Sequence, residues 1–160
     1  MAFDLVTFHT ALSFIAIAAG AVVVLDLLRS GPTPFWTGLF LVTSILTSVT
    51  GYFFPFSGVL PSHIVGGVAL LILAVVLAAR YGFGLGGAWR RVDAIGLVAS
   101  LYLLCFVLIA QAFGKIPALH ALAPTQSEPA FAIAQAVALL LFVLLGIAAA
   151  RSAGRIRKAA

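Results

Sequence analysis

Five long apolar runs constrain this chain more than any other feature of its sequence. They cover residues 5–28, 35–54, 61–80, 92–113 and 130–150, and each is close to the ~20 residues that a helix needs to cross a bilayer. Backbone N–H and C=O groups find no water inside a membrane, so such runs must be helices. Outer-membrane strands alternate apolar and polar residues, and these runs do not. The sequence therefore predicts an all-α polytopic membrane protein, with residues 1–160 forming one domain of five transmembrane helices.

The composition supports the same class. Hydrophobic residues make up 64% of the chain and charged residues only 8%, whereas about a quarter of a soluble domain is charged. The net charge of +5 would suggest nucleic acid as the partner of a soluble protein. In a membrane protein, basic residues in the loops explain it, so we expect the lipid bilayer as partner and no nucleic acid.

The basic residues predict the orientation. In a five-span topology, eight of the nine Lys and Arg residues fall on one side, and Lys115 alone falls on the other. Cytoplasmic loops carry the excess of Lys and Arg in membrane proteins. We therefore expect the N-terminus outside and the C-terminus in the cytoplasm. The eight residues are Arg29, Arg80, Arg90, Arg91, Arg151, Arg155, Arg157 and Lys158.

Two histidines lie at matched depth in this topology. His9 is about one turn into the first run and His63 about one turn into the third, both counted from the outer face. Ionisable residues inside a membrane are usually functional, but interfacial polar residues often only anchor a helix. Small residues share a helical face with each histidine, which suits a flat ligand or simply the close packing of helices. His120 lies on the same side, in the segment 114–129, which we expect to lie over the outer mouth of the bundle.

These side chains suggest two kinds of cofactor site. Haem b could take His9 and His63 as axial ligands, and Lys115 is the basic residue on that side able to meet a propionate. A transition metal such as zinc or copper would instead use His9, His63 and His120, with Glu128 as a fourth candidate. If no cofactor binds, the histidines are interfacial hydrogen-bonding groups.

Other polar and aromatic residues have simpler interpretations. Thr43, Thr47 and Thr50 form a row that could line a polar path, but Thr hydroxyls in membrane helices commonly bond back to carbonyls of their own helix. Tyr52 and the phenylalanines around it could wall a ring-shaped ligand, although an interfacial aromatic belt explains them as well.

Motifs for other chemistry are missing from the sequence. It contains no CxxC, HExxH, phosphate loop or serine nucleophile elbow, and no acidic residue lies in the middle of a span. Three functions therefore stay open, and whether the chain is an enzyme is undecided. The first is a redox or electron-transfer protein with a haem or metal near the outer face. The second is a non-enzymatic accessory or assembly protein, as a homo-oligomer or with another membrane protein. The third is a small transporter or channel.

Several stretches are similar to a known kind of protein. Residues 47–56 (TSVTGYFFPF) and 61–81 (PSHIVGGVALLILAVVLAARY) resemble small bacterial inner-membrane proteins whose domain has no assigned function, as do residues 8–28 and 119–131. This resemblance implies the inner (plasma) membrane of a bacterium and no particular activity. A looser likeness to b-type cytochrome bundles rests on His9 and His63.

Overall fold

A computed structural model describes residues 4–29, 31, 33–54 and 61–159, with the backbone only at residues 61–62 and 156–159. Within this part of the chain, five helices are long and apolar enough to cross a membrane, and no strand is present. The predicted all-α bundle of five spans is confirmed. The elements are α1 (Leu5–Arg29), α2 (Pro34–Thr50), η1 (Gly51–Phe53), α3 (Pro61–Leu77), η2 (Ala78–Gly82), α4 (Trp89–Lys115), α5 (Pro117–Leu122) and α6 (Pro129–Ala159).

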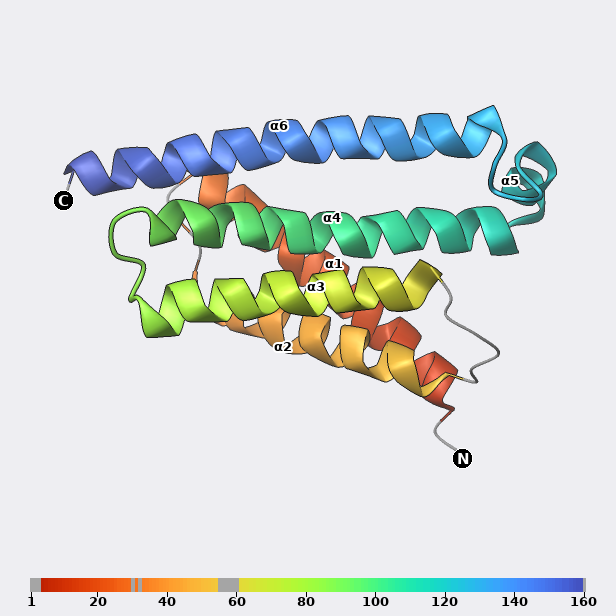
Figure 1. The fold of residues 1–160 in the computed structure, drawn as a ribbon, viewed down its shortest axis with the longest axis horizontal. Helices are drawn as coiled ribbons and strands as arrows, with labels where there is room; N and C mark the ends of the chain where they lie inside the picture. The colour runs from red at the N-terminus through yellow and green to blue at the C-terminus, as the bar shows by residue number, and fades with distance from the viewer. Residues whose placement is uncertain (1–3, 30, 32, 55–60, 160) are drawn as a thin grey trace.

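Helices α1 to α4 pack in a ring, and α6 lies outside it against α4 and α1. Figure 1 shows α2, α3, α4 and α6 lying side by side, with α1 crossing obliquely behind them. Successive long helices run in opposite directions, so the bundle has two distinct ends. The histidine end is where α1, α3 and α6 begin and α2 and α4 end. The arginine end is the opposite one.

The observed helices differ from the predicted spans mainly at their ends. Helix α6 continues to Ala159 instead of ending near residue 150, because the alanines and basic residues of the tail are good helix formers. After α3 the chain widens into one π-helical turn, η2, and then turns through Gly84 and Gly87, both with a φ of +55°. Glycine adopts this left-handed backbone without strain.

The segment 114–129, which we expected to lie over the outer mouth of the bundle, is partly helical. It contains α5, and its remaining residues pack back on α4, where the Gln126 side chain donates a hydrogen bond to the Ala110 carbonyl (2.8 Å). Phe113 and Phe131 meet edge to face across the same connection. The segment therefore ties α4 to α6 beside the ring of α1 to α4 (Figure 1).

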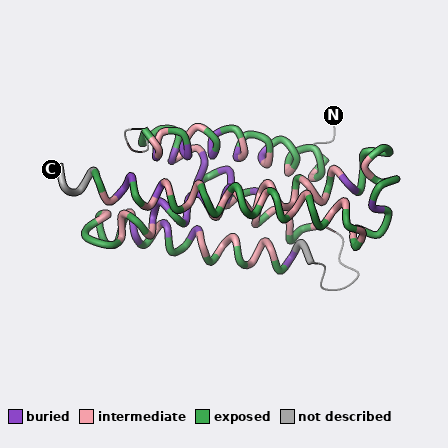
Figure 2. The backbone as a smooth tube through the Cα atoms, turned by 90° about the horizontal axis from the view of Figure 1, so that it is seen from above, coloured by how far each residue is buried: buried purple, intermediate pink, exposed green. Residues whose placement is uncertain are grey.

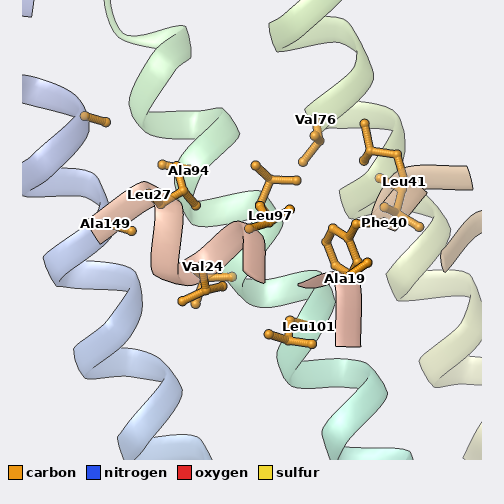
Figure 3. Close-up of a cluster of buried hydrophobic side chains, with 14 residues drawn as sticks. Ala19, Val24, Leu27, Phe40, Leu41, Val76, Ala94, Leu97, Leu101 and Ala149 are labelled. Carbon is orange, nitrogen blue, oxygen red and sulfur yellow. The ribbon is translucent and has the colours of Figure 1, made fainter. Parts of the chain in front are cut away.

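Among the described residues, the main cluster of buried hydrophobic side chains lies in the arginine half of the bundle. It is drawn from the later parts of α1, α3 and α6 and the earlier parts of α2 and α4 (Figure 3). At its centre Gly20 lets α1 approach α2 and α4, since a Cβ there would lie 2.7 Å from the Phe40 ring and 2.8 Å from Leu101. The buried members are Ala19, Val23, Val24, Leu27, Phe40, Leu41, Leu73, Val76, Ala94, Leu97, Val98, Leu101, Ala149 and Ala153.

One buried ion pair closes the arginine end of α3 and α4. Arg80, in the π-helical turn, donates from Nε and Nη2 to the two carboxylate oxygens of Asp93 at 3.2 and 2.7 Å. The Asp93 side chain is 3% exposed and the Arg80 side chain 14%. A bidentate pair fixes the relative orientation of the two side chains as well as their distance, so it joins η2 firmly to the start of α4.

The outer surface of the bundle is apolar. Figure 2 shows exposed positions along every long helix, and many of them are large hydrophobic residues such as Leu71, Leu140 and Leu144. Soluble monomers rarely expose so much apolar surface to water, whereas such a surface is suited to contact with lipid tails. The exposure pattern therefore agrees with helices that face a bilayer.

Candidate functional site

The histidine half of the bundle contains a cavity of about 620 Å³ in place of a packed core. All four helices of the ring line it, together with the η1 turn, and Leu73 separates it from the core below. Its walls are mainly apolar, with polar groups at intervals. The polar and ionisable lining residues are His9, Thr10, Ser13, Ser44, Thr47, Ser48, Tyr52, His63, Ser100, Gln111 and Lys115.

The cavity opens sideways between α1 and α4. Its lining on α2 and α3 is buried or half-buried, apart from η1, where Tyr52 is exposed. The exposed lining residues on α1 include Val6 and Phe14, and those on α4 include Leu108 and Lys115. A ligand could therefore pass between these two helices directly from the surrounding lipid, with its polar end near the end of α4.

His9 is held in one orientation by the end of α2. Its Nδ1 lies 2.9 Å from the Thr50 hydroxyl, which itself donates to the Leu46 carbonyl at 2.7 Å. Because the one hydroxyl proton is used in that bond, we assign the proton of this contact to His9 Nδ1. The Phe54 ring meets the imidazole edge to face at 5.0 Å. Nε2 then carries the lone pair, which is the state of a histidine that ligates a metal or accepts a hydrogen bond.

His63 lies across the cavity in the first turn of α3. Its backbone carbonyl accepts a hydrogen bond from the Tyr52 hydroxyl (2.7 Å), and the Tyr52 ring is tilted against the imidazole at 5.5 Å. Gly66 and Gly67 leave room for this ring, because a Cβ at Gly67 would lie 3.1 Å from the tyrosine oxygen. Tyr52 thus fastens η1 to α3 beside the site.

Lys115 completes the set of ionisable groups that line the cavity within the described residues. It is exposed at the last residue of α4 and lines the opening together with Ile116. His9, His63 and Lys115, which the sequence suggested as one haem site, therefore line the same cavity.

The other proposed ligands are not part of this group. His120 is exposed on α5 and does not line the cavity. Glu128 accepts hydrogen bonds from the backbone N–H groups of Thr125 and Ser127 and from the Thr125 hydroxyl. Among the residues that the structure describes, no three His, Cys, Asp or Glu side chains are grouped closely enough to hold a metal ion. The three-histidine metal set is thus not assembled in this structure.

The inner end of the cavity contains a polar feature that the sequence did not reveal. Ser44, Thr47 and Ser100 border it from α2 and α4, and their buried hydroxyl oxygens have no hydrogen-bond partner in the described part of the chain. The expected bond back to the helix is confirmed for Thr43 and Thr50, but not for Thr47. A buried unpartnered hydroxyl costs free energy, so three around one space favour a ligand that can bond to them. Their signal in the sequence is weak, since single Ser and Thr residues are common in membrane helices.

Comparisons with protein-family models, with curated proteins and with solved structures found no match to this chain. The geometry of the cavity therefore carries the functional argument alone.

Proposed function

We propose that this protein binds a flat, mainly apolar cofactor with an acidic edge in the cavity, that the cofactor is haem b, and that the role is redox or electron transfer. The observation that carries the proposal is the presence of two histidines from different helices and one lysine around a single cavity of about 620 Å³. When bound, haem supplies one-electron chemistry at its iron.

His9 has the features of an axial ligand. A ligating imidazole usually donates its other N–H to a fixed acceptor, which sets the tautomer and the ring orientation. The contact between Nδ1 and Thr50 at 2.9 Å supplies such an acceptor. His63, buried on α3 and lining the same cavity, is the proposed second ligand. Two imidazoles from α1 and α3 would approach a ring lying between these helices from opposite sides.

Lys115 would meet the acidic edge of the ring. The opening between α1 and α4 is where a propionate would emerge, and Lys115 is exposed there. A charge-assisted hydrogen bond is worth ~1.5–3 kcal/mol when the groups are partly desolvated. The apolar walls would exclude water from the rest of the ring.

Haem suits the lining better than zinc or copper does. Haem iron needs only one or two protein ligands, whereas a structural zinc site needs four. The described residues offer two histidines at the cavity and no cluster of three ligating side chains.

An absorption spectrum of the purified full-length protein, before and after addition of haem, tests the proposal. A Soret band should appear in the wild type and shift or vanish in His9→Ala and in His63→Ala. His120→Ala is the matched control, because His120 lies outside the cavity, and it should leave the band unchanged. Thr50→Val should shift the band or the reduction potential, because it removes the acceptor of His9 Nδ1. A protein that neither carries nor takes up haem refutes the proposal, and so does a band that all three histidine variants change equally.

The three hydroxyls at the inner end favour a second candidate of another class. A non-enzymatic binding or transport protein for a lipophilic molecule with hydrogen-bonding groups would use Ser44, Thr47 and Ser100 at the inner end and the histidines at the mouth. Below the cavity the core is densely packed, so an open channel through the bundle does not fit this arrangement. Lack of haem together with retention of a lipophilic compound, lost in Ser44→Ala, would favour this candidate.

The proposed setting is the inner membrane of a bacterium, with the histidine end outside and the arginine end in the cytoplasm. The support is the distribution of charge: Arg29, Arg80, Arg90, Arg91, Arg151 and Arg155 lie at one end of the bundle and Lys115 lies at the other. This asymmetry is the one that orients membrane proteins during insertion.

A further inference from the structure

A second hollow lies on the outside of the bundle, between α4 and α6. We call it the α4–α6 groove; it has a volume of about 620 Å³ and begins at Arg91 and Arg151 at the arginine end. From there it runs toward the middle of the bundle past Val98 and Gly146 to Tyr102 and Phe142. It shares no lining residue with the histidine cavity.

The groove faces the region where lipid tails would lie. Ile95 on α4 and Leu139, Val143 and Ile147 on α6 are 44–49% exposed along its walls. Its floor is formed where the two helices approach closely, since a Cβ at Gly146 would be in ordinary contact with Val98 at 3.8 Å. The small residue leaves space above the floor that a larger one would fill.

The length of the groove matches one leaflet. Along α6 it extends over the thirteen residues from Leu139 to Arg151, whose twelve steps of ~1.5 Å span ~18 Å. Half of a ~30 Å hydrocarbon core is ~15 Å. An extended chain lying in the groove would thus run from the membrane surface to about the bilayer midplane.

Two guanidinium groups stand at the surface end of the groove. Arg91 lies across α6 against Gly154, where an added Cβ would be 2.7 Å from its Nη2. Arg151 is exposed on α6. Neither has a carboxylate partner within the described residues, because the Asp93 carboxylate is bound to Arg80 and the Asp26 carboxylate accepts from Thr33. Two unpaired positive charges at the membrane surface attract an anionic head group.

We infer that the α4–α6 groove binds an anionic phospholipid, with an acyl chain along the apolar walls and the phosphate between Arg91 and Arg151. The complementary charge and the one-leaflet length together favour a lipid over a soluble anion, because a soluble anion would not contact the apolar walls of the groove. Basic pockets between membrane helices are a known way to hold such head groups.

The test is native mass spectrometry of the full-length protein released from membranes of equal phosphatidylcholine and phosphatidylglycerol. The wild type should retain phosphatidylglycerol preferentially. Arg91→Gln/Arg151→Gln should lower that preference by about tenfold or more, from the attraction of anionic lipid to each basic residue. Arg29→Gln/Arg155→Gln removes the same charge from the same end outside the groove and should keep the preference.

Two further variants test the head-group site and the apolar part of the α4–α6 groove separately. Gly154→Ala keeps every charge but displaces the Arg91 guanidinium, so it should weaken the preference for phosphatidylglycerol. Gly146→Leu fills the groove and should reduce retention of the lipid, whereas Gly38→Leu, on α2 where no atom lies within 4 Å of the added Cβ, should not.

Three outcomes would overturn the inference. The first is an equal loss in the Arg29/Arg155 control pair, which would mean attraction by net charge alone. The second is displacement of the lipid by inorganic phosphate, which would mean that only the anion is bound. The third is a dimer that Gly146→Leu abolishes, which would mean that a second copy of the chain fills the groove.

Discussion

Replacing Asp93 with alanine should destabilise the bundle more than any change to a surface charge. The carboxylate accepts two hydrogen bonds from Arg80, at 3.2 and 2.7 Å, and is almost fully enclosed, with its side chain 3% exposed. Removal of this carboxylate leaves the largely buried Arg80 guanidinium without a counter-charge. No other ion pair was found among the described residues, so no neighbouring carboxylate would replace it.

The size of the effect follows from how far Arg80 can reach water. Removing one partner of a buried ion pair costs ~3–5 kcal/mol. Arg80 is 14% exposed and lies at the arginine end, so its guanidinium can be partly rehydrated after the substitution. We therefore expect a loss near the lower limit, about 3 kcal/mol. Arg80→Ala should cost at least as much, because the Asp93 carboxylate left behind is the more enclosed of the two groups.

A double-mutant cycle in detergent micelles measures the pair itself. The free energy of unfolding would be obtained from titration with a denaturing detergent for the wild type, Asp93→Ala, Arg80→Ala and the double variant. The double variant should be less destabilised than the sum of the single ones, with a coupling of at least ~1.5 kcal/mol. Arg155→Ala, which removes an exposed charge at the same end, should change stability little. A coupling under ~0.5 kcal/mol, the usual error of additivity, would refute the role of the pair in joining α3 to α4.

Three further predictions test other parts of the structure. Gly20→Ala should destabilise the protein by ~1–3 kcal/mol, because the added Cβ would press on the Phe40 ring and Leu101. Gly38→Ala is the control and should be neutral or slightly stabilising. Equal effects of the two substitutions in the same titration would contradict the close approach of α1. In a Cys105→Ala background, Ala121→Cys and Gly82→Cys should react with a membrane-impermeant thiol reagent from opposite sides, with Ala121→Cys labelled in intact cells; labelling from one side would contradict the five-span topology. Desolvation raises the pKa of Glu128, but hydrogen bonds from the backbone N–H groups of Glu128, Thr125 and Ser127 and from the Thr125 hydroxyl outweigh it and hold this pKa below its ordinary value. The ionised carboxylate therefore stabilises the loop above the ordinary glutamate pKa, and this contribution is lost as pH falls through the lowered value. Hydrogen exchange of residues 123–129 should be slower in the wild type than in Glu128→Gln at about pH 6, and the difference should shrink as the pH falls through the pKa of Glu128. A difference that does not change with pH would argue against the carboxylate.

The pattern of apolar runs in the sequence was enough to predict the helices. Each span must hydrogen-bond its own backbone N–H and C=O groups in lipid, which is a local requirement. Apolar length, the proline that opens α2 and the glycines after η2 all act within a few residues of where they stand. Where the observed helix ends differ from the predicted ones, the cause is not the length of the apolar run. Helix α6 is extended past residue 150 by helix-forming residues, and α5 forms inside the segment 114–129 between two apolar runs.

The candidate site was predicted in part. The equal depth of His9 and His63 follows from their positions in parallel helices, and the structure places both at one cavity with Lys115. Three features depend on which faces of the helices meet. They are the position of His120 outside the cavity, the opening between α1 and α4, and the unpartnered hydroxyls of Ser44 and Ser100.

By itself, then, the sequence determined that the chain has five apolar helices and which polar groups share each end, because burial in lipid and charge distribution depend on residue type and order alone. Only the tertiary structure decided that the arginine half is packed and the histidine half hollow. Gly20 draws α1 onto Phe40 in one half, whereas His9 and Tyr52 are tied to Thr50 and α3 around an unfilled space in the other. Packing of this kind depends on side chains far apart in the chain, and no local pattern records whether they will interlock or leave room for a ligand.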